Sequence, residues 1–481
     1  MSTSYRVFRN TSWAVIAKIS YRISNSIIAI LVSRFIGVKA TGAYNVGLTY
    51  YTIGLSLAVW GFDQIMIREV AKSKDLVEKY FGNLLIMQTV FGVLTFCIIL
   101  IISFLVPYPL QTRMLVRIFS LSIISESIIL ICQGVFLVLE NVKVISVVNS
   151  ILSILKVVVV FYAIFRKGDL VNIAWIVTSI SLISMTIFIY LTRQYLPKRG
   201  FKPDWRFGLG VIKSSLVIFL ISIIFALDSR IDIVALSFIS DDYNVGLLTA
   251  ALGIISFFYL FPQAFRDVIY PVLSRLHHSD PESTNKLYGL STKYILLLTL
   301  PMAMGVSILS PEIINLIYKE AFLPAVPLLR IGIWAFPAYA IMIFNSRLLV
   351  VDYKGNFVVK ALLVSSILLL LSNLLLYPVF GITVSAIIRV VSTVLVTLAI
   401  ILFVSKKLYK TYFIKFIPKI FLSLVMMSVF VYILKDISLL LSIIIGAILY
   451  FSVLFLLKLF DQQDLSYWQT IYSSLKSRNG K

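Results

Sequence analysis

The chain has 481 residues, of which 60% are hydrophobic and only 13% are charged, and its mean hydropathy is +0.99. A soluble domain is about 45–50% apolar and about 25% charged, so this composition excludes an ordinary soluble enzyme and a disordered protein. The 43 lysines and arginines exceed the 21 acidic residues and give a formal net charge of +22, which on a soluble protein would suggest a nucleic-acid partner.

Long apolar runs recur from one end of the chain to the other. A helix needs about 20 mostly apolar residues to span a bilayer, and continuous runs exclude the alternating strands of a membrane barrel. The sequence therefore predicts an all-α polytopic membrane protein with about 14 transmembrane helices. In chain order these lie near residues 12–35, 42–62, 80–106, 114–139, 144–165, 170–192, 210–238, 244–263, 290–310, 324–350, 356–377, 381–404, 414–434 and 437–459. The segment 263–278 is expected to continue the eighth span as an amphipathic helix.

The distribution of basic residues predicts the orientation. With an even number of spans and both termini in the cytoplasm, 25 lysines and arginines lie on the cytoplasmic side and 6 lie outside. The positive charge thus reports topology in a cytoplasmic (inner) cell membrane, and no nucleic-acid partner is expected. The polar first ten residues and the full-length first span do not indicate a cleavable signal.

An internal repeat organises the chain. The pentapeptide Tyr44–Leu48 recurs intact as Tyr243–Leu247, an offset of 199 residues. The copies open spans that are an even number of helices apart, so the two halves are parallel, a plan found in transporters. We expect an N-terminal six-helix lobe at 1–200, a second six-helix lobe at 206–408, two additional helices at 411–459 and a cytoplasmic tail at 460–481.

Several short runs resemble one family. They are the opening Arg9–Trp13, the run Ser33–Gly37, the triplet Gly42–Tyr44, and the stretch from Gly61-Phe62 to Ile67–Glu69. The chain resembles the O-antigen and capsule-type polysaccharide flippases of the multidrug/oligosaccharidyl-lipid/polysaccharide exporter superfamily. This resemblance implies a two-lobed fold with twelve plus two spans. It also implies alternating-access transfer of a polyprenyl-pyrophosphate-linked oligosaccharide from the cytoplasmic to the outer leaflet.

Charged and amide side chains inside the spans are the candidate substrate path. Lys18, Arg22 and Asn25 are spaced i, i+4 and i+7, which places them on one helix face. Such cations suit a diphosphate, while amides and hydroxyls hydrogen-bond sugar hydroxyls. The predicted set is Lys18, Arg22, Asn25, Arg34, Glu126, Asn149, Lys156 and Arg389. The alternatives are that Lys18 snorkels to the cytoplasm, that Arg34 is a helix-end residue, and that the neighbouring serines serve helix packing.

The seventh span carries the densest charge, with Asp228 and Asp232 one turn apart. Buried carboxylates of transporters often bind Na⁺ or a proton. Some relatives are thought to bind a cation between the seventh, eleventh and twelfth spans, where Asn373 and Thr393 would add neutral oxygens. We therefore hypothesise a coupling-cation site of Asp228 or Asp232 with Asn373 and Thr393. The alternative is an ion pair that only stabilises the fold.

Two other functions compete with the flippase. An exporter of small amphipathic molecules would need an acidic cavity for cations, whereas bases outnumber acids in the first-lobe spans. A polysaccharide polymerase or ligase would need a large folded outer loop, whereas the longest predicted outer connection is 310–324. No GxxxxGK[ST] phosphate loop occurs, and the two adjacent histidines offer almost no metal ligands.

These features together predict a transporter rather than an enzyme. We expect no catalytic residues, no cofactor and no metal site beyond possible coupling to Na⁺ or H⁺. The expected partners are a lipid-linked oligosaccharide, membrane lipids and other polysaccharide-assembly proteins, with the monomer as the functional unit.

Overall fold

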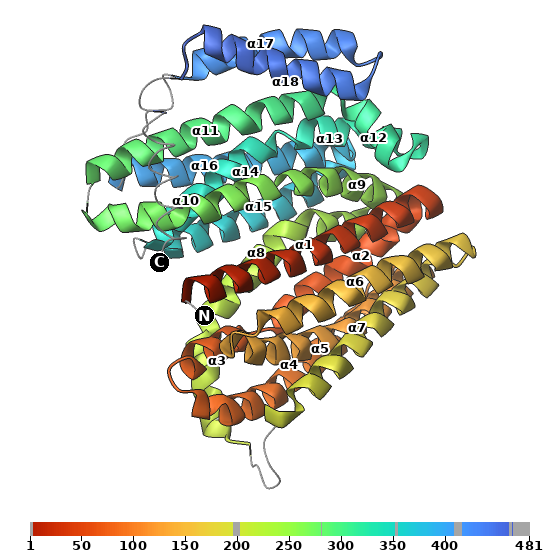
Figure 1. Cartoon of the computed structure of the whole chain (residues 1–481). Coiled ribbons are helices and arrows are strands. Elements are labelled where there is room, and N and C mark those ends of the chain that lie inside the picture. Colours follow the sequence, from red (N-terminus) through yellow and green to blue (C-terminus); the bar gives the residue numbers. More distant parts are fainter. Residues whose placement is uncertain are drawn as a thin grey trace. The chain divides into compact units, whose positions relative to one another are not determined.

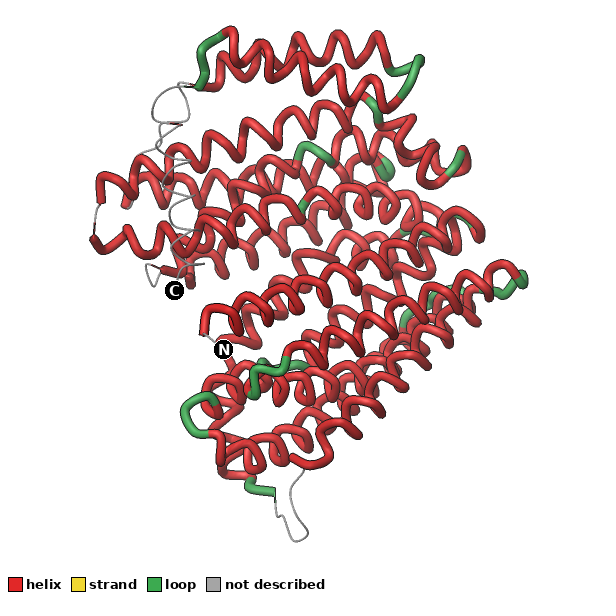
Figure 2. The backbone as a smooth tube through the Cα atoms, viewed as in Figure 1, coloured by secondary structure: helices red, strands yellow, loops and turns green. Residues whose placement is uncertain are grey.

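The computed structural model describes residues 3–195, 203–279, 281–351, 355–407, 416–460 and 464. The described backbone consists of helices joined by short loops, and no residue in these ranges forms a strand (Figure 2). This confirms the prediction of an all-α protein. The chain divides into two compact units, Met1–Gly246 and Leu247–Lys481, which are called the first and the second unit below.

The helices of the first unit and the start of the second follow the predicted order. They are α1 Thr3–Ile36, α2 Val38–Ala58, α3 Phe62–Val70, α4 Val77–Leu105, α5 Leu110–Val138, α6 Val142–Phe165, α7 Leu170–Thr192, α8 Trp205–Ile239 and α9 Asp242–Phe258, in which the unit boundary falls.

The second unit continues with nine more helices among its described residues. They are α10 Leu260–Ser279, α11 Pro281–Ile308, α12 Ser310–Tyr318, α13 Val326–Gly332, α14 Ala335–Val351, α15 Gly355–Phe380, α16 Thr383–Lys407, α17 Ile417–Leu434 and α18 Leu439–Leu456.

Thirteen of the fourteen predicted spans have the length and composition of a membrane-spanning segment. Among the described residues, twelve helices are long and apolar enough to cross a membrane. The bent pair Glu320–Gly332 and Ala335–Leu349, with an angle of 48° between its parts, makes a thirteenth. The remaining predicted span corresponds to α2, which is 21 residues long and rich in glycine, threonine and tyrosine. Each of the fourteen predicted runs thus coincides with one helix or with this bent pair.

Local sequence features set several helix ends. The carboxylate of Asp169 accepts a hydrogen bond from the backbone N–H of Asn172 at 2.8 Å, and Asp204 accepts one from Phe207 at 2.9 Å. Both carboxylates cap the first turn of a helix, α7 and α8 respectively. Gly61 adopts a left-handed conformation with φ 72°, so the chain turns between α2 and α3.

Helix α5 lies at the centre of the first unit (Figure 1). It packs against α2, α4 and α7, while α1 packs along α6 and α8 packs against α2, α3 and α4. Its buried positions include serines as well as isoleucines, valines and phenylalanines. Small hydroxyl residues let helices approach closely and exchange hydrogen bonds where lipid offers no hydrophobic driving force.

The two copies of the repeated pentapeptide open neighbouring helices, α2 and α9. A Cβ atom added at Gly42 of α2 would collide with the carbonyl oxygen of Asp242 and lie 2.9 Å from the Gly246 nitrogen. A Cβ added at Gly246 would collide with the carbonyl oxygen of Val38. The two backbones therefore touch directly, and only glycine fits at either position.

In the second unit, α14 packs against α10, α11 and α16, and α15 packs against α16. Helices α17 and α18 form an antiparallel hairpin that lies against α11 (Figure 1). We call this pair the C-terminal hairpin. Helix α10 follows α9 directly, so the amphipathic helix predicted at 263–278 is confirmed.

The structure differs from the sequence-based expectation at two connections. The predicted span 42–62 ends four residues early, and a separate amphipathic helix, α3, follows it. The outer connection expected at 310–324 is not a loop, because α12 and the 3-10 helix Glu320–Ala325 fill it. Pro311 in the first turn of α12 favours that helix start. The predicted lobe limits at 200 and 206 stay a prediction.

Candidate substrate-path surface

A row of polar contacts joins α1 to α6 in the first unit. The row uses residues of α6 spaced three or four apart, which lie on one helix face. The contacts are Ser146 Oγ to the Trp13 carbonyl oxygen at 2.6 Å, Ser150 Oγ to Ser20 Oγ at 3.1 Å, Ser24 Oγ to the Ser153 carbonyl oxygen at 3.0 Å, and Lys156 Nζ to Asn25 Oδ1 at 2.8 Å.

Lys156 is the buried cation of this row, with only 9% of its surface exposed. Its ammonium group donates to Asn25 Oδ1 and lies 5.3 Å from the centre of the Tyr21 ring. A hydrogen bond from a charged donor and a cation–π contact both stabilise the ammonium form in a place with little water. Asn25 is itself exposed, so the contact lies at the edge of an accessible surface.

Glu126 supplies a carboxylate near this cation from α5. Its Oε1 accepts a hydrogen bond from Ser181 Oγ of α7 at 3.2 Å, and Ser181 also bonds Ser125 Oγ at 2.7 Å. The opposite charges of Glu126 and Lys156 interact, although no direct ion pair joins these two described side chains. Helices α1, α5, α6 and α7 thus contribute to one polar region, which we call the N-terminal polar surface.

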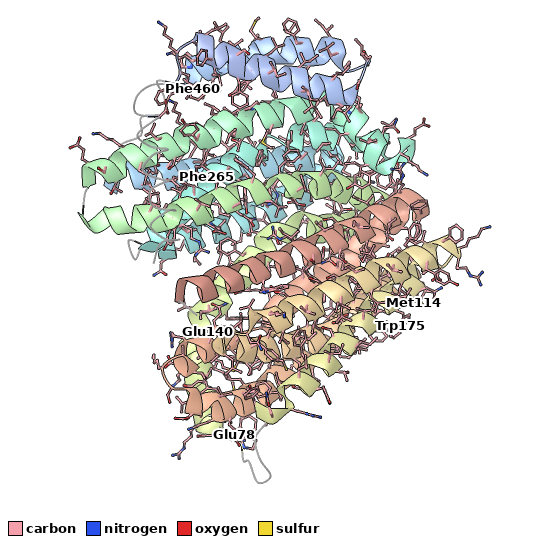
Figure 3. All side chains as sticks on the ribbon, in the orientation of Figure 1. Glu78, Met114, Glu140, Trp175, Phe265 and Phe460 are labelled. Carbon is pink, nitrogen blue, oxygen red and sulfur yellow. The ribbon has the colours of Figure 1, made fainter. Side chains whose placement is uncertain are left out.

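Three more predicted residues lie on the helices of this surface. Arg22 and Arg34 are exposed side chains of α1, and Asn149 of α6 accepts a hydrogen bond from Gln133 Nε2 at 3.4 Å. Lys18 falls within α1, but its side chain lies outside the described residues. Glu140, which ends the polar face of α5 in sequence, is exposed in a turn with φ 56° (Figure 3).

The other predicted site residues are divided between the units. Asp228 and Asp232 belong to α8 of the first unit, where Asp232 is 1% exposed. Asn373 of α15 is buried, and Thr393 of α16 donates its hydroxyl to the Arg389 carbonyl oxygen at 2.8 Å. Because the hypothetical cation site takes residues from both units, it stays a prediction, as does a role for Arg389 in the substrate path.

Metal-binding side chains do not gather within the ranges that the structure describes. No group of three or more histidine, cysteine, aspartate or glutamate residues there has the geometry to hold a metal ion. The N-terminal polar surface offers ammonium, guanidinium, amide and hydroxyl groups instead. Such groups can bind an anion and the hydroxyls of a sugar without covalent chemistry.

Sequence reasoning missed one polar cluster, at the connection between α4 and α5. Tyr108 Oη lies 2.7 Å from Ser237 Oγ and 3.1 Å from Tyr50 Oη, and Thr112 Oγ1 donates to Asp242 Oδ2 at 2.6 Å. These bonds fasten the end of α8 and the start of α9 to α2, to the α4–α5 connection and to the start of α5. Single tyrosines, serines and threonines carry no periodic signal, so only the tertiary structure could reveal them.

The sequence also contained a signal that was not used. Lys293 lies inside the predicted span 290–310, and a charge in such a span is by default a position of interest. The structure pairs it with Asp464, which the sequence places in the predicted tail. That pair is described below.

Comparison with known families decides the classification. Residues 7–277, more than half of the chain, match the sequence model of the family described as "Polysaccharide biosynthesis protein". The chain belongs to this family. The resemblance to polysaccharide flippases is therefore confirmed at the level of the family. No curated protein matches the chain in sequence.

Solved structures show that the chain shares its fold with several membrane transporters. A structure titled "Lipid II flippase MurJ, inward closed conformation" has a TM-score of 0.74 and 18% identity, covering 92% of this chain and 98% of that one. An inward-facing multidrug resistance MATE family transporter of the MOP superfamily has a TM-score of 0.64 and 14% identity, covering 82% and 98%. A MOP superfamily transporter from Pyrococcus furiosus has a TM-score of 0.55 and 15% identity, covering 84% and 96%.

Proposed function

We propose that the protein is a flippase that moves a polyprenyl-(pyro)phosphate-linked oligosaccharide from the cytoplasmic to the outer leaflet by alternating access. The family and the fold support transport of a lipid-linked substrate for surface polysaccharide biosynthesis. The observation that carries the proposal is the buried ammonium group of Lys156, held at the edge of the N-terminal polar surface by Asn25.

The charge of this surface matches such a substrate. A diphosphate carries negative charge that lysine and arginine can neutralise, and its sugars present hydroxyls that amides and serines can bind. Lys156 and the exposed Arg22 supply the positive charge, and Asn25 supplies the amide. Lys18, Arg34, Asn149 and Arg389 extend the proposed path, with Glu126 beside it.

The two alternative functions fit these residues less well. An exporter of amphipathic cations would be expected to present carboxylates, whereas the charged residues that α1 and α6 bring to the N-terminal polar surface are basic and include Arg22 and Lys156. A polymerase or ligase would need a folded outer domain, and the longest predicted outer connection is occupied by α12 and a short 3-10 helix. We infer a transporter that works as a monomer in the cell membrane with both termini in the cytoplasm.

Coupling to an ion gradient is the second part of the proposal. Asp228 or Asp232 would bind Na⁺ or a proton together with Asn373 and Thr393. The burial of Asp232 and Asn373 supports this, since buried oxygen atoms in a membrane protein favour a bound cation or an internal partner. If Asp228→Asn and Asp232→Asn both transport with unchanged Na⁺ and pH dependence, the coupling site is wrong.

The decisive experiment compares Lys156→Met with Lys143→Gln, an exposed lysine of the same helix. Each variant replaces the chromosomal gene, and surface glycan and intracellular lipid-linked glycan are quantified. We expect Lys156→Met to reduce export about tenfold or more, because the proposed hydrogen bond from the Lys156 ammonium group to a substrate phosphate is lost. A hydrogen bond to a charged group contributes about 1.5–3 kcal/mol, and about 1.4 kcal/mol corresponds to a factor of ten.

The control variant should export normally, and both proteins should accumulate in the membrane to wild-type levels. Lys156→Arg, which keeps the charge, should retain more export than Lys156→Met. Normal surface glycan in a strain that lacks the gene and any compensating transporter would refute the flippase proposal. Normal export by Lys156→Met would remove Lys156 from the substrate path.

A further inference from the structure

A buried ion pair links α11 to the residues that follow the C-terminal hairpin. The Lys293 side chain is completely buried, and its Nζ lies 2.9 and 3.0 Å from the two carboxylate oxygens of Asp464. Nζ also donates to the carbonyl oxygen of Leu459 at 2.8 Å. An ammonium group has three hydrogens, so all of them have acceptors here. The hydroxyl of Tyr294 donates to Asp464 Oδ1 at 3.0 Å.

Aromatic rings that flank the C-terminal hairpin, one before α17 and one after α18, lie close to the ammonium group of Lys293. The ring centre of Phe416, directly before α17, lies 4.6 Å from Lys293 Nζ. The ring centre of Phe460, shortly after α18, lies 5.9 Å from the same atom. Figure 3 labels Phe460 beside the open end of the hairpin. Lys419 Nζ also donates to the Lys458 carbonyl oxygen at 3.3 Å, which joins the two ends. Lys293 therefore contacts the point where the hairpin opens.

A second polar contact binds the hairpin one helical turn further along α11. Tyr450 of α18 is completely buried and donates its hydroxyl to the carbonyl oxygen of Leu297 at 3.0 Å. Within the hairpin, Gly446 lets α18 approach α17, since a Cβ there would lie 2.6 Å from a Val431 methyl carbon. The hairpin is thus a close-packed unit that makes polar contacts with α11 at two positions, Lys293 and Leu297.

Apolar packing by itself gives the hairpin little preference for one docking position. The sequence of α18 contains no charged residue, and its surface is almost wholly apolar. Apolar helices gain little by leaving lipid for another apolar helix, because lipid tails are equally apolar. A buried charge, in contrast, is stable only beside an opposite charge or other polar groups. Removal of one member of a buried ion pair therefore destabilises the folded protein far more than removal of both.

We infer that α11 carries a specific docking surface for the C-terminal hairpin, and that the Lys293–Asp464 pair holds the hairpin there. The partner of this surface is the protein's own C-terminal hairpin with the flanking residues Phe416, Leu459, Phe460 and Asp464. The inference does not depend on which molecule the protein transports. It assigns a structural role to Asp464, which the sequence places in the predicted tail.

The test uses the full chain with a protease recognition sequence inserted between Lys407 and Phe416 and an affinity tag on the N-terminus. The protein is purified in mild detergent, cleaved and captured on the tag, and the fraction of hairpin fragment retained is measured. The variants are Lys293→Met, Asp464→Asn, and the charge exchange of Lys293→Asp with Asp464→Lys. The matched control is Glu282→Gln, which breaks the exposed Lys286–Glu282 pair of the same helix.

We expect the wild type and Glu282→Gln to retain the hairpin fragment. Lys293→Met and Asp464→Asn should each release about ten times as much of the fragment as the wild type does. The charge exchange should restore part of the retention. Folding of the first unit is checked by the protection of the buried thiol of Cys132.

If Lys293→Met does not accumulate, Asp464→Asn and the charge exchange decide the question, because both keep polar groups that can pair. If these two also fail, Tyr450→Phe, which removes one neutral hydrogen bond, should still release more hairpin than Glu282→Gln. Retention equal to the wild type in Lys293→Met, Asp464→Asn or Tyr450→Phe would overturn the inference, as would a charge exchange that retains no more hairpin than Asp464→Asn.

Discussion

Direct backbone contact between α2 and the start of α9 makes a prediction with an internal control. Gly42→Ala and Gly246→Ala each place a methyl group where a backbone oxygen already lies. Relief requires the two helices to separate, since the obstructing atoms are backbone rather than flexible side-chain ends. Gly210→Ala in α8 of the first unit is the control, because nothing lies within 4 Å of the added methyl group.

The sign of the effect should differ between the two kinds of site. Overpacking costs about 1–3 kcal/mol, so each of the two contact variants should lose about that much stability. The control should gain about 0.5–1 kcal/mol, because alanine is favoured over glycine within a helix. The same chemical change therefore has opposite consequences at positions that are all helical.

Thermal unfolding provides the assay. Cys97 is exposed and Cys132 is buried, so a Cys97→Ser background leaves one thiol that reacts with a fluorogenic dye only when the first unit opens. We expect the midpoint temperature to be lower than that of the parent for Gly42→Ala and Gly246→Ala, and equal to or higher than it for Gly210→Ala. A contact variant that melts at or above the parent temperature would refute the close approach of α2 and α9.

Two further predictions concern buried polar groups of the first unit. Tyr108→Phe leaves the hydroxyls of Ser237 and Tyr50 without this hydrogen-bond partner. The loss should lower the free energy of unfolding by about 1–3 kcal/mol and lower the midpoint temperature. Tyr162→Phe, at an exposed position, should leave the midpoint unchanged. Burial raises the pKa of the Asp63 carboxyl group, although backbone N–H groups partly oppose the shift. The folded state thus binds the proton more tightly than the unfolded state, and stability falls as the pH rises above the ordinary aspartate pKa of about 3.9. Asp63→Asn should raise the midpoint at pH 7–8 and lose this advantage near pH 3; an equal gain at both pH values would contradict the linkage.

The spans could be predicted because their determinants are local. A run of about 20 apolar residues is sufficient to form a membrane helix, and proline, glycine and charged residues mark its ends. Errors arose where the pattern is not simply apolar. The turn at Gly61 divides an apparently continuous segment, and the helix at Ser310–Tyr318 is too short and amphipathic to stand out as a span.

The candidate site could be predicted only in part. Helical spacing placed Asn25 and Lys156 on polar faces of their helices, and the structure joins them at 2.8 Å. The spacing could not show that Ser181 of α7 would bond Glu126, because a helix face does not specify its neighbour. The residues of the hypothetical cation site were grouped by resemblance, and that grouping stays a prediction.

The sequence by itself therefore determined the class of protein, the spans and the family. A run of about 20 apolar residues forms a membrane helix whatever the rest of the chain does, and the family follows from short motifs. Only the tertiary structure decided which polar groups meet. Lys293 and Asp464 are 171 positions apart, and neither residue's neighbours in the chain indicate the other. A buried charge requires a partner, but the path of the whole chain decides which residue that partner is.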